Sequence, residues 1–195
     1  MTGQFNLDSL RYRLLPLNSV RESEEERAFA AVAIIINPHD RGGSVLFIKR
    51  TERRDDAWSG QIAFPGGRRS PIDKGLAETA VRETREEVGI QLTGHELLGR
   101  LPIVTTRSRR MRVLPFVFQL KSTVSTRVNE EVADTFWVPL SDLEGLEAQR
   151  REVKVDNGIL AAESYVYETH VIWGLTFRII NLLLGRETRS NLWKQ

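Results

Sequence analysis

Short apolar runs separated by turn residues dominate the first third of the chain. Residues 29–36 form a continuous apolar run that ends at an Asn-Pro pair, which is typical of a buried strand. A second run at residues 44–49 follows a turn with two glycines, so the two runs predict a hairpin. Ile62 and Phe64 precede the Gly66-Gly67 pair, which predicts a short strand leading into a glycine turn.

The rest of the chain mixes strand-like and helix-like patterns without strict alternation. This order predicts an α/β (α+β) fold, with helices packed on the faces of a mixed sheet rather than a doubly wound parallel sheet. An N-terminal helix is expected to carry Leu7, Leu10, Leu14 and Leu15, and further strands are expected at residues 98–104, 113–120 and 131–138. A short helix should follow Pro139, with Ser141 or Asp142 as its cap. The C-terminal part should form a hairpin over residues 151–168, around Asp156-Asn157-Gly158, and a last helix at residues 170–184.

Residues 74–89 form the clearest helical pattern in the chain, with Asp73 as its expected N-cap. At about 100° per residue, one arc of this helix collects small and apolar residues and is expected to be buried. A neighbouring arc collects three carboxylates near the C-terminal end. The buried arc contains Ala77, Ala80, Val81, Thr84 and Val88, and the acidic arc contains Glu83, Glu86 and Glu87.

The three carboxylates destabilise the helix if no cation or basic side chain neutralises them. Like charges three and four residues apart repel, and the C-terminal end of a helix disfavours negative charge. One interpretation is a solvated face neutralised by Arg82 and Arg85. The other is a site for a hard cation, because carboxylates without cysteine or histidine suit Mg²⁺ or Mn²⁺ rather than zinc.

Composition narrows the class of protein. The 195 residues contain 41% hydrophobic positions, no cysteine and three histidines, which excludes disulfides and thiolate chemistry. Neither a secretory signal nor an apolar run long enough to span a bilayer is visible, so we expect a cytoplasmic protein without a membrane partner. The net charge of +2 does not favour nucleic-acid binding, although the arginine-rich residues 107–112 leave that alternative open.

The glycine turn and the acidic helix together resemble the Nudix box, the signature of the Nudix hydrolases. The spacing from Gly67 to Arg82 is one residue longer than usual, and Lys74, preceded by Asp73, occupies the place of an early glutamate. The shared positions are Gly66-Gly67, Arg82-Glu83, Glu86-Glu87 and Gly89-Ile90.

This resemblance implies a Nudix-type α/β/α sandwich with a mixed sheet. A single domain would cover residues 1–195, with a core at about residues 28–145 and a C-terminal hairpin and helix at about residues 150–185. It also implies an enzyme, a pyrophosphohydrolase that uses a divalent metal to cleave a diphosphate linkage in a small molecule.

One branch of the family, the coenzyme A pyrophosphatases, shares the longer spacing. Residues 46–51 and 60–67 resemble its upstream motif, and similarity continues over about residues 28–184. Asp56 and Trp58 stand where that branch usually has an arginine and a histidine. The branch implies cleavage of coenzyme A or an acyl-coenzyme A to 4′-phosphopantetheine and 3′,5′-ADP.

The resemblance assigns roles to individual residues. The implied metal ligands are Glu83, Glu86, Glu87 and the carbonyl of Gly66, and the implied catalytic set is Glu83, Glu86, Arg82 and Glu131. Arg82 would orient a carboxylate, while the general base is left open between Glu83, Glu130 and Glu131. Arg50, Arg68, Arg69 and Trp58 are candidate substrate contacts; simple solvation of Arg68 and Arg69, or a loop-anchoring role for Trp58, is the alternative.

The sequence leaves alternatives to coenzyme A hydrolysis open. Another nucleoside diphosphate derivative, such as ADP-ribose, a dinucleotide or a nucleoside triphosphate, is the nearest alternative substrate. A catalytically silent Nudix-like binding module is a second alternative. Either a monomer or a homodimer fits the sequence.

Overall fold

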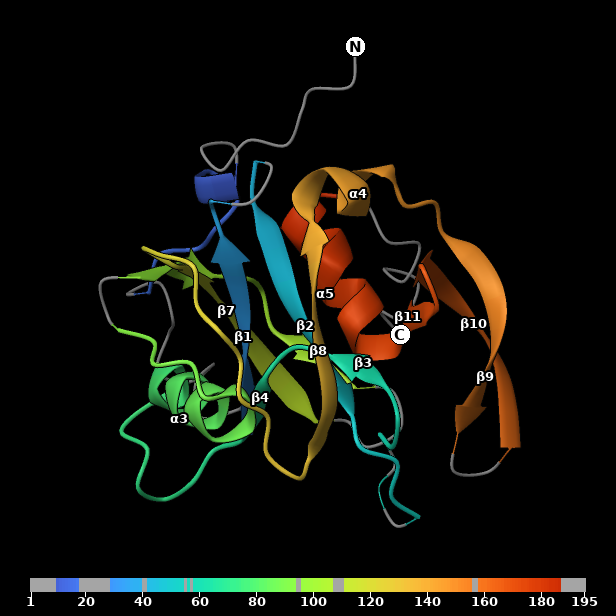
Figure 1. Cartoon of the computed structure of the whole chain (residues 1–195), viewed down its shortest axis with the longest axis horizontal. Helices are drawn as coiled ribbons and strands as arrows, with labels where there is room; N and C mark the ends of the chain where they lie inside the picture. The colour runs from blue at the N-terminus through green and yellow to red at the C-terminus, as the bar shows by residue number, and fades with distance from the viewer. Residues whose placement is uncertain are drawn as a thin grey trace, which may run out of the picture.

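The computed structural model describes residues 10–17, 29–39, 42–54, 56, 58–93, 96–106, 111–155 and 158–186. Leu7, residues 107–110 of the arginine-rich segment and the Asp156-Asn157 turn lie outside this part. The elements, labelled in Figure 1, are β1 (Ala30–Asn37), β2 (Ser44–Arg50), β3 (Ile62–Ala63), β4 (Gly66–Arg68), α3 (Leu76–Val88), β5 (Leu97–Arg100), β6 (Val104–Thr105), β7 (Arg112–Gln119), β8 (Val132–Pro139), α4 (Leu140–Gly145), β9 (Gln149–Val155), β10 (Gly158–Tyr167), β11 (His170–Trp173) and α5 (Gly174–Leu184).

The first eight strands form one mixed sheet, as the sequence predicts. Its main path runs β3-β2-β1-β7-β5, while β4, β6 and β8 pair with β1, β7 and β2 respectively. The β1–β7 pair is parallel and the other pairs are antiparallel. A second, three-stranded sheet of order β11-β10-β9 forms the expected C-terminal hairpin and one further strand.

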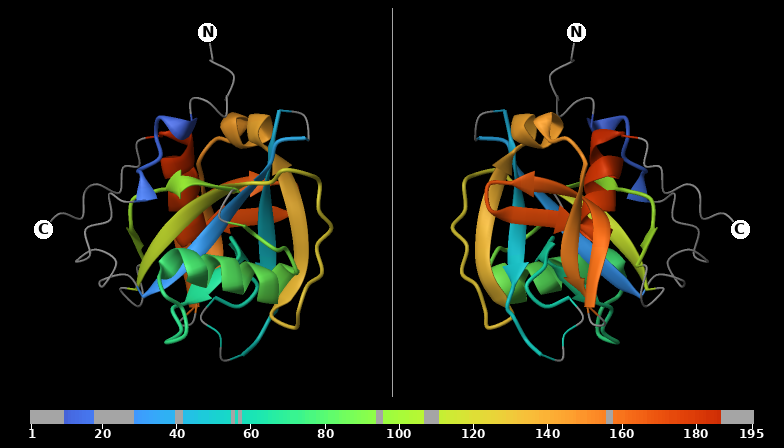
Figure 2. Two further views of the ribbon diagram at one scale, coloured as in Figure 1. Left: turned by 90° about the vertical axis from the view of Figure 1, so that its left-hand side faces the viewer. Right: turned by 90° about the vertical axis from the view of Figure 1, so that its right-hand side faces the viewer.

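Strand β1 lies at the centre of both layers of the core. All eight of its residues are buried, which explains its unbroken apolar sequence. Because side chains alternate across a strand, Ala31, Ala33 and Ile35 pack on the face covered by α3. Val32 and Ile34 pack on the opposite face with α5. The two helices therefore cover opposite faces of the sheet, as Figures 1 and 2 show.

The C-terminal sheet and helix share the core of the main sheet. Tyr165 of β10 and Ile172 of β11 belong to the cluster that also contains the α5 side chains. The Tyr165 hydroxyl donates a buried hydrogen bond of 2.9 Å to Asn181 of α5. At the other end of the described chain, Leu10 is fully buried in the same cluster.

Two predicted elements are wrong in extent. The run at residues 98–104 is two strands, β5 and β6, because Pro102 between them has no N–H to donate to β7. Residues 170–173 are strand β11 rather than the start of the last helix, because they pair with residues 164–167 of β10. The helix α5 begins only at Gly174.

The predicted helix caps are also wrong. Helix α4 begins at Leu140 with Pro139 at its N-cap, and neither Ser141 nor Asp142 caps it. The reason is that the β2–β8 ladder extends to this point, where the Leu140 N–H donates to the Gly43 carbonyl at 2.9 Å. Helix α3 begins at Leu76 with Gly75 at its N-cap, so Asp73 lies outside the helix.

None of the helices in the described ranges is long and apolar enough to cross a membrane.

Candidate active site

The three carboxylates of α3 differ strongly in their surroundings. Glu87 is buried, with 2% of its surface exposed, whereas the Glu83 side chain is 18% exposed and that of Glu86 is 46% exposed. Of the two interpretations of the acidic arc, the solvated face fails for Glu87, because α3 packs with that side toward strand β4. Ala77 and Val81, expected to be buried, are only partly so.

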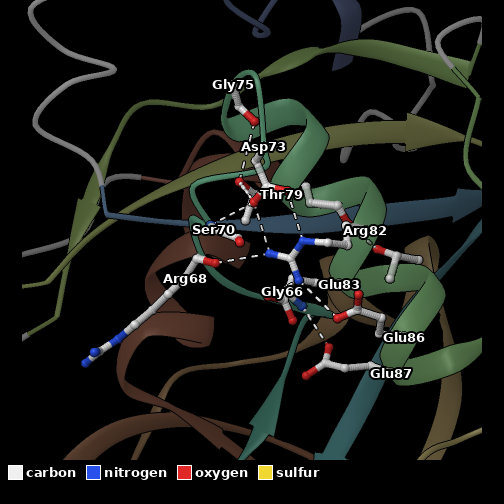
Figure 3. A network of polar contacts seen from close by, with 12 residues as sticks. Gly66, Arg68, Ser70, Asp73, Gly75, Thr79, Arg82, Glu83, Glu86 and Glu87 are labelled. Carbon is white, nitrogen blue, oxygen red and sulfur yellow. Dashed lines mark hydrogen bonds and ion pairs between the residues drawn. The ribbon is translucent and has the colours of Figure 1, made fainter.

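The Gly66-Gly67 pair forms strand β4, which pairs with β1 and lies against α3. The Gly66 N–H donates to Glu87 Oε2 at 2.9 Å (Figure 3). Gly66 has φ of 153°, and a Cβ there would lie 2.3 Å from the Ala31 carbonyl oxygen. A Cβ on Gly67 would lie 2.5 Å from Cδ of Glu83. Glycine at both positions therefore lets the backbone reach the carboxylates.

Arg82 links two of the carboxylates. Its Nη1 lies 2.8 Å from Glu83 Oε1 and 3.0 Å from Glu86 Oε2. Its Nη2 also donates to the carbonyl oxygen of Arg68 at 3.2 Å. Arg82 therefore pairs with two carboxylates of the cluster, while its role in orienting them stays a prediction.

Asp73 is the main partner of Arg82. Arg82 Nε and Nη2 donate to its two carboxylate oxygens at 2.9 and 3.0 Å. Asp73 Oδ2 also accepts from the Ser70 N–H and the Thr79 hydroxyl (Figure 3). The hydrogen bond from Arg82 lowers the pKa of Asp73 to about 2, and the same pair raises the pKa of Arg82. Asp73 therefore anchors Arg82 rather than capping the helix, a role that the sequence analysis missed.

At the buried end of the carboxylate cluster, the Arg50 guanidinium lies 4.0 Å from Glu87 and only partly offsets the effect of burial. Burial raises the pKa of Glu87 to about 8, against the opposing effect of the Gly66 N–H, and neighbouring Glu83 and Glu131 raise it further. Burial likewise raises the pKa of Glu83, although Arg82 opposes that shift. A cation bound here would relieve the cost of burying these carboxylates.

The donor set fits a hard divalent cation, but the side chains are not yet arranged around one. In the described part of the chain, no three acidic or histidine side chains form a ready metal-binding group. Glu83 and Glu86 turn to Arg82, while Glu87 turns to Gly66. Because Arg82 contacts Oε1 of Glu83 and Oε2 of Glu86, the second oxygen of each carboxylate would be the one to bind a cation.

Arg50 reaches the cluster from the end of β2. Its Nη1 lies 4.0 Å from Glu87 Oε1, and its Nη2 lies 2.7 Å from Asp56 Oδ2. Trp58, on the same loop as Asp56, is partly buried, and its backbone N–H donates to Asp56 Oδ1 at 3.0 Å. The structure thus brings Arg50 to the carboxylates, with Asp56 as its closest partner.

Arg68 and Arg69 are not brought to the carboxylates. The Arg68 side chain points away from Glu83, Glu86 and Glu87 in Figure 3, and only its backbone carbonyl joins the Arg82 network. Arg69 Nη2 donates to the carbonyl oxygens of Asp73 and Lys74, at 3.4 and 3.2 Å. Arg69 therefore contributes to the loop before α3.

The segment before β8 holds two of the three candidate general bases, Glu130 and Glu131. Asn129 connects this segment to α3: its N–H donates to the Glu87 carbonyl at 3.1 Å, and its Oδ1 accepts from the Glu131 N–H at 2.9 Å. The charge of Glu131 is felt by both Glu83 and Glu87, adding to the effect of burial on their pKa values. Glu130 instead lies 3.8 Å from Arg53. Glu131 is therefore the better placed of the two.

An open hollow of about 520 Å³ adjoins the exposed side of the cluster. It lies at the C-terminal end of α3 and is lined by Arg85, Glu86, Gly89, Arg127, Val128 and Asn129.

Comparison with known proteins identifies the family. A model of the NUDIX domain matches residues 21–160. The chain belongs to the Nudix family. The expectation of a Nudix hydrolase, an enzyme class that cleaves pyrophosphate bonds, is thereby confirmed at the level of the family.

Several relatives carry the same family name. "Uncharacterized Nudix hydrolase NudL" of Yersinia enterocolitica is 38% identical over 77% of this chain and 78% of its own length. The protein of that name from Photorhabdus laumondii is 34% identical over 89% of this chain and 92% of its own length. "Probable nudix hydrolase C6G9.05" of Schizosaccharomyces pombe is 26% identical over 94% of this chain, which spans 66% of that protein.

Solved structures confirm the Nudix fold. A MutT/nudix family protein from Enterococcus faecalis superposes with a TM-score of 0.56 at 11% identity, covering 93% of this chain and 73% of that one. A Nudix hydrolase from Alicyclobacillus acidocaldarius gives a TM-score of 0.50 at 20% identity, covering 58% of this chain and 79% of that one. At these identities the likeness concerns the fold alone.

Replacing each glycine of β4 by alanine should separate folding from activity. Gly66→Ala sets a Cβ against the backbone of β1, so we expect a loss of about 3 kcal/mol in the free energy of unfolding. Gly67→Ala meets only the end of the Glu83 side chain. That variant should lose less than about 1 kcal/mol but much of its hydrolytic activity, because Glu83 is displaced. Denaturant unfolding and activity assays of both variants test this, and equal destabilisation would contradict it.

The Asp73–Arg82 pair should make stability depend on acid pH. The pKa of Asp73 is depressed from 3.8 to about 2 in the folded state, so its contribution is complete above pH 3.8 and is lost as pH falls toward 2. Asp73→Asn removes this titration. We expect the stability difference between native protein and variant to shrink by about 2 kcal/mol between pH 6 and pH 2. Denaturant titrations across this range measure it; a constant difference would contradict the role of the pair.

Proposed function

We propose that this protein hydrolyses the diphosphate linkage of coenzyme A or an acyl-coenzyme A, with Mg²⁺ or Mn²⁺ as cofactor. The products would be 4′-phosphopantetheine and 3′,5′-ADP. The observation that carries the hydrolase proposal is the placement of Glu83 and Glu87 against the Gly66-Gly67 strand. The coenzyme A proposal rests on the longer spacing from Gly67 to Arg82 and on the motifs at residues 46–51 and 60–67.

The proposed metal ligands are the oxygens of Glu83, Glu86 and Glu87, together with the Gly66 carbonyl. When bound there, a divalent cation supplies neutralisation of the phosphate charge and activation of water. Burial of Glu87 favours this arrangement, since a buried carboxylate is stabilised by a nearby positive charge.

The remaining roles belong to side chains of this chain. Arg82, anchored by Asp73, holds Glu83 and Glu86 in position. Glu131, or Glu83 itself, would accept a proton from the attacking water while the water oxygen bonds to phosphorus and the bridging P–O bond breaks. Arg50 is the proposed substrate contact that lies near the cluster, and Trp58 follows Asp56 on the loop whose carboxylate pairs with Arg50. The positions of Arg68 and Arg69 do not support a role for them in substrate binding.

The net charge of the chain bears on which partners and substrates it binds. A small-molecule substrate and no nucleic-acid partner agree with the net charge of +2. We propose a cytoplasmic enzyme, monomeric or homodimeric, that acts away from membranes.

Replacing Glu87 by glutamine tests the metal-dependent hydrolase. The change keeps the shape but removes an anionic ligand, so activity with millimolar Mg²⁺ or Mn²⁺ should fall by at least about 100-fold, roughly 3 kcal/mol. The thermal unfolding temperature should not fall, because glutamine keeps the shape and an oxygen that can accept the Gly66 N–H. Glu78→Gln, an exposed change on the same helix, serves as the control and should retain activity. Full activity of Glu87→Gln in the presence of a chelator would contradict the proposal.

A substrate panel tests the coenzyme A assignment. We expect coenzyme A or its thioesters to give the highest kcat/KM with Mg²⁺ among coenzyme A, dephospho-coenzyme A, ADP-ribose, NADH, a dinucleoside polyphosphate and a nucleoside triphosphate. If ADP-ribose or a triphosphate exceeds coenzyme A ten-fold, about 1.4 kcal/mol of transition-state preference, the substrate assignment fails while the hydrolase assignment stands.

A further inference from the structure

Arg50 lies between two carboxylates of different function. On one side its Nη1 is 4.0 Å from Oε1 of Glu87, the buried carboxylate of the cluster. On the other side its Nε and Nη2 both donate to Oδ2 of Asp56, at 3.2 and 2.7 Å. The Asp56 contacts are much the shorter, so Asp56 is the primary counter-ion of Arg50.

Asp56 is itself fixed by its own loop. Its second carboxylate oxygen, Oδ1, accepts the Trp58 N–H at 3.0 Å, and its carbonyl accepts the Ser59 N–H at 3.0 Å. The Arg50 and Asp56 side chains are only 23% and 18% exposed. Water therefore screens this ion pair less than an exposed one, and the loop holds the negative charge beside Arg50.

Two further arginines, Arg82 and Arg53, are also paired with acidic groups. Arg82 contacts Asp73, Glu83 and Glu86. Arg53 lies 3.8 Å from Glu130 and donates to the carbonyl of the same residue. Neutralisation of Arg50 by Asp56 thus removes much of the positive charge that an anionic ligand would meet beside Glu87.

We propose that Asp56 is a specificity-determining residue: by neutralising Arg50, it lowers the preference of the site for diphosphate substrates that carry an additional phosphomonoester group. The effect follows from Coulomb's law, since the interaction energy of a ligand with a local charge grows with the charge of the ligand. The inference rests on the proposed hydrolysis of a diphosphate at this site. It implies that the 3′-phosphate of coenzyme A adds less to the binding affinity here than it would beside an Arg50 without an acidic partner.

Two nucleotides that differ by one phosphate isolate this effect. Dissociation constants for 5′-AMP and 3′,5′-ADP are measured by calorimetry with Mg²⁺ for the native protein and for Asp56→Asn. The asparagine keeps an oxygen to accept the Trp58 N–H but removes the charge. We expect the affinity ratio of 3′,5′-ADP to 5′-AMP to rise about ten-fold in Asp56→Asn, and the gain to shrink as salt is raised.

Two further variants serve as controls. Glu163→Gln changes the net charge equally but lies exposed on β10 in the second sheet, and it should leave the affinity ratio unchanged. In an Arg50→Gln background, Asp56→Asn should no longer change the ratio, because the charge that it exposes is absent. The ratio of kcat/KM for coenzyme A to that for dephospho-coenzyme A should move in the same direction as the affinity ratio.

An affinity ratio that is unchanged or falls in Asp56→Asn overturns the inference, as does the same rise in Glu163→Gln or in the Arg50→Gln background. Loss of binding of both nucleotides in Asp56→Asn also overturns it. Nucleotide binding does not require turnover, so the outcome is separate from that of the proposed function. A native protein that does not hydrolyse coenzyme A defeats the substrate assignment, whereas the nucleotide ratios decide the role of Asp56.

Discussion

The close approach of helix α3 to strand β4 is the constraint on which the site depends. The Gly66 N–H reaches the Glu87 carboxylate at 2.9 Å, and Gly67 leaves no room for a side chain beside Glu83. This approach is possible because β4 pairs with β1, the strand that both layers of the core share. Glu87 therefore belongs to the deeply packed part of the fold, whereas Glu83 and Glu86 lie nearer the surface.

The site also depends on the pairing of its arginines with aspartates. A group of three glutamates on one helix is held by arginines that are themselves held by aspartates: Asp73 for Arg82 and Asp56 for Arg50. In each pair the aspartate fixes the direction of the guanidinium, and the net charge of the pair is lower than that of the arginine alone. Arg82 is thereby suited to orienting Glu83 and Glu86, and Arg50 to a limited attraction for phosphate. A divalent cation would add the positive charge that the buried carboxylates still lack.

Much of the fold could be predicted because local patterns agree with the tertiary structure. The apolar run at residues 29–36 predicted the buried strand β1, although Phe29 lies outside it and is exposed. The Gly66-Gly67 pair with Glu83 and Glu87 indicated the family. The errors arose where distant partners compete with local preference. Residues 170–173 pair with β10 rather than joining a helix, and Asp73 binds Arg82 rather than capping α3. Neither partner is visible from the spacing of residues along the chain.

The sequence by itself determined the class of fold, the acidic helix and its set of carboxylate oxygens, because periodicity and residue chemistry are local properties. Only the tertiary structure decided which carboxylate is buried, since that depends on the rotation of α3 against β4. It also decided which arginines reach the cluster. Arg50 does and Arg68 does not, because β2 ends at the buried carboxylate while the Arg68 side chain leaves β4 in the opposite direction. Electrostatic neighbours depend on distance in space, and folding alone sets that distance.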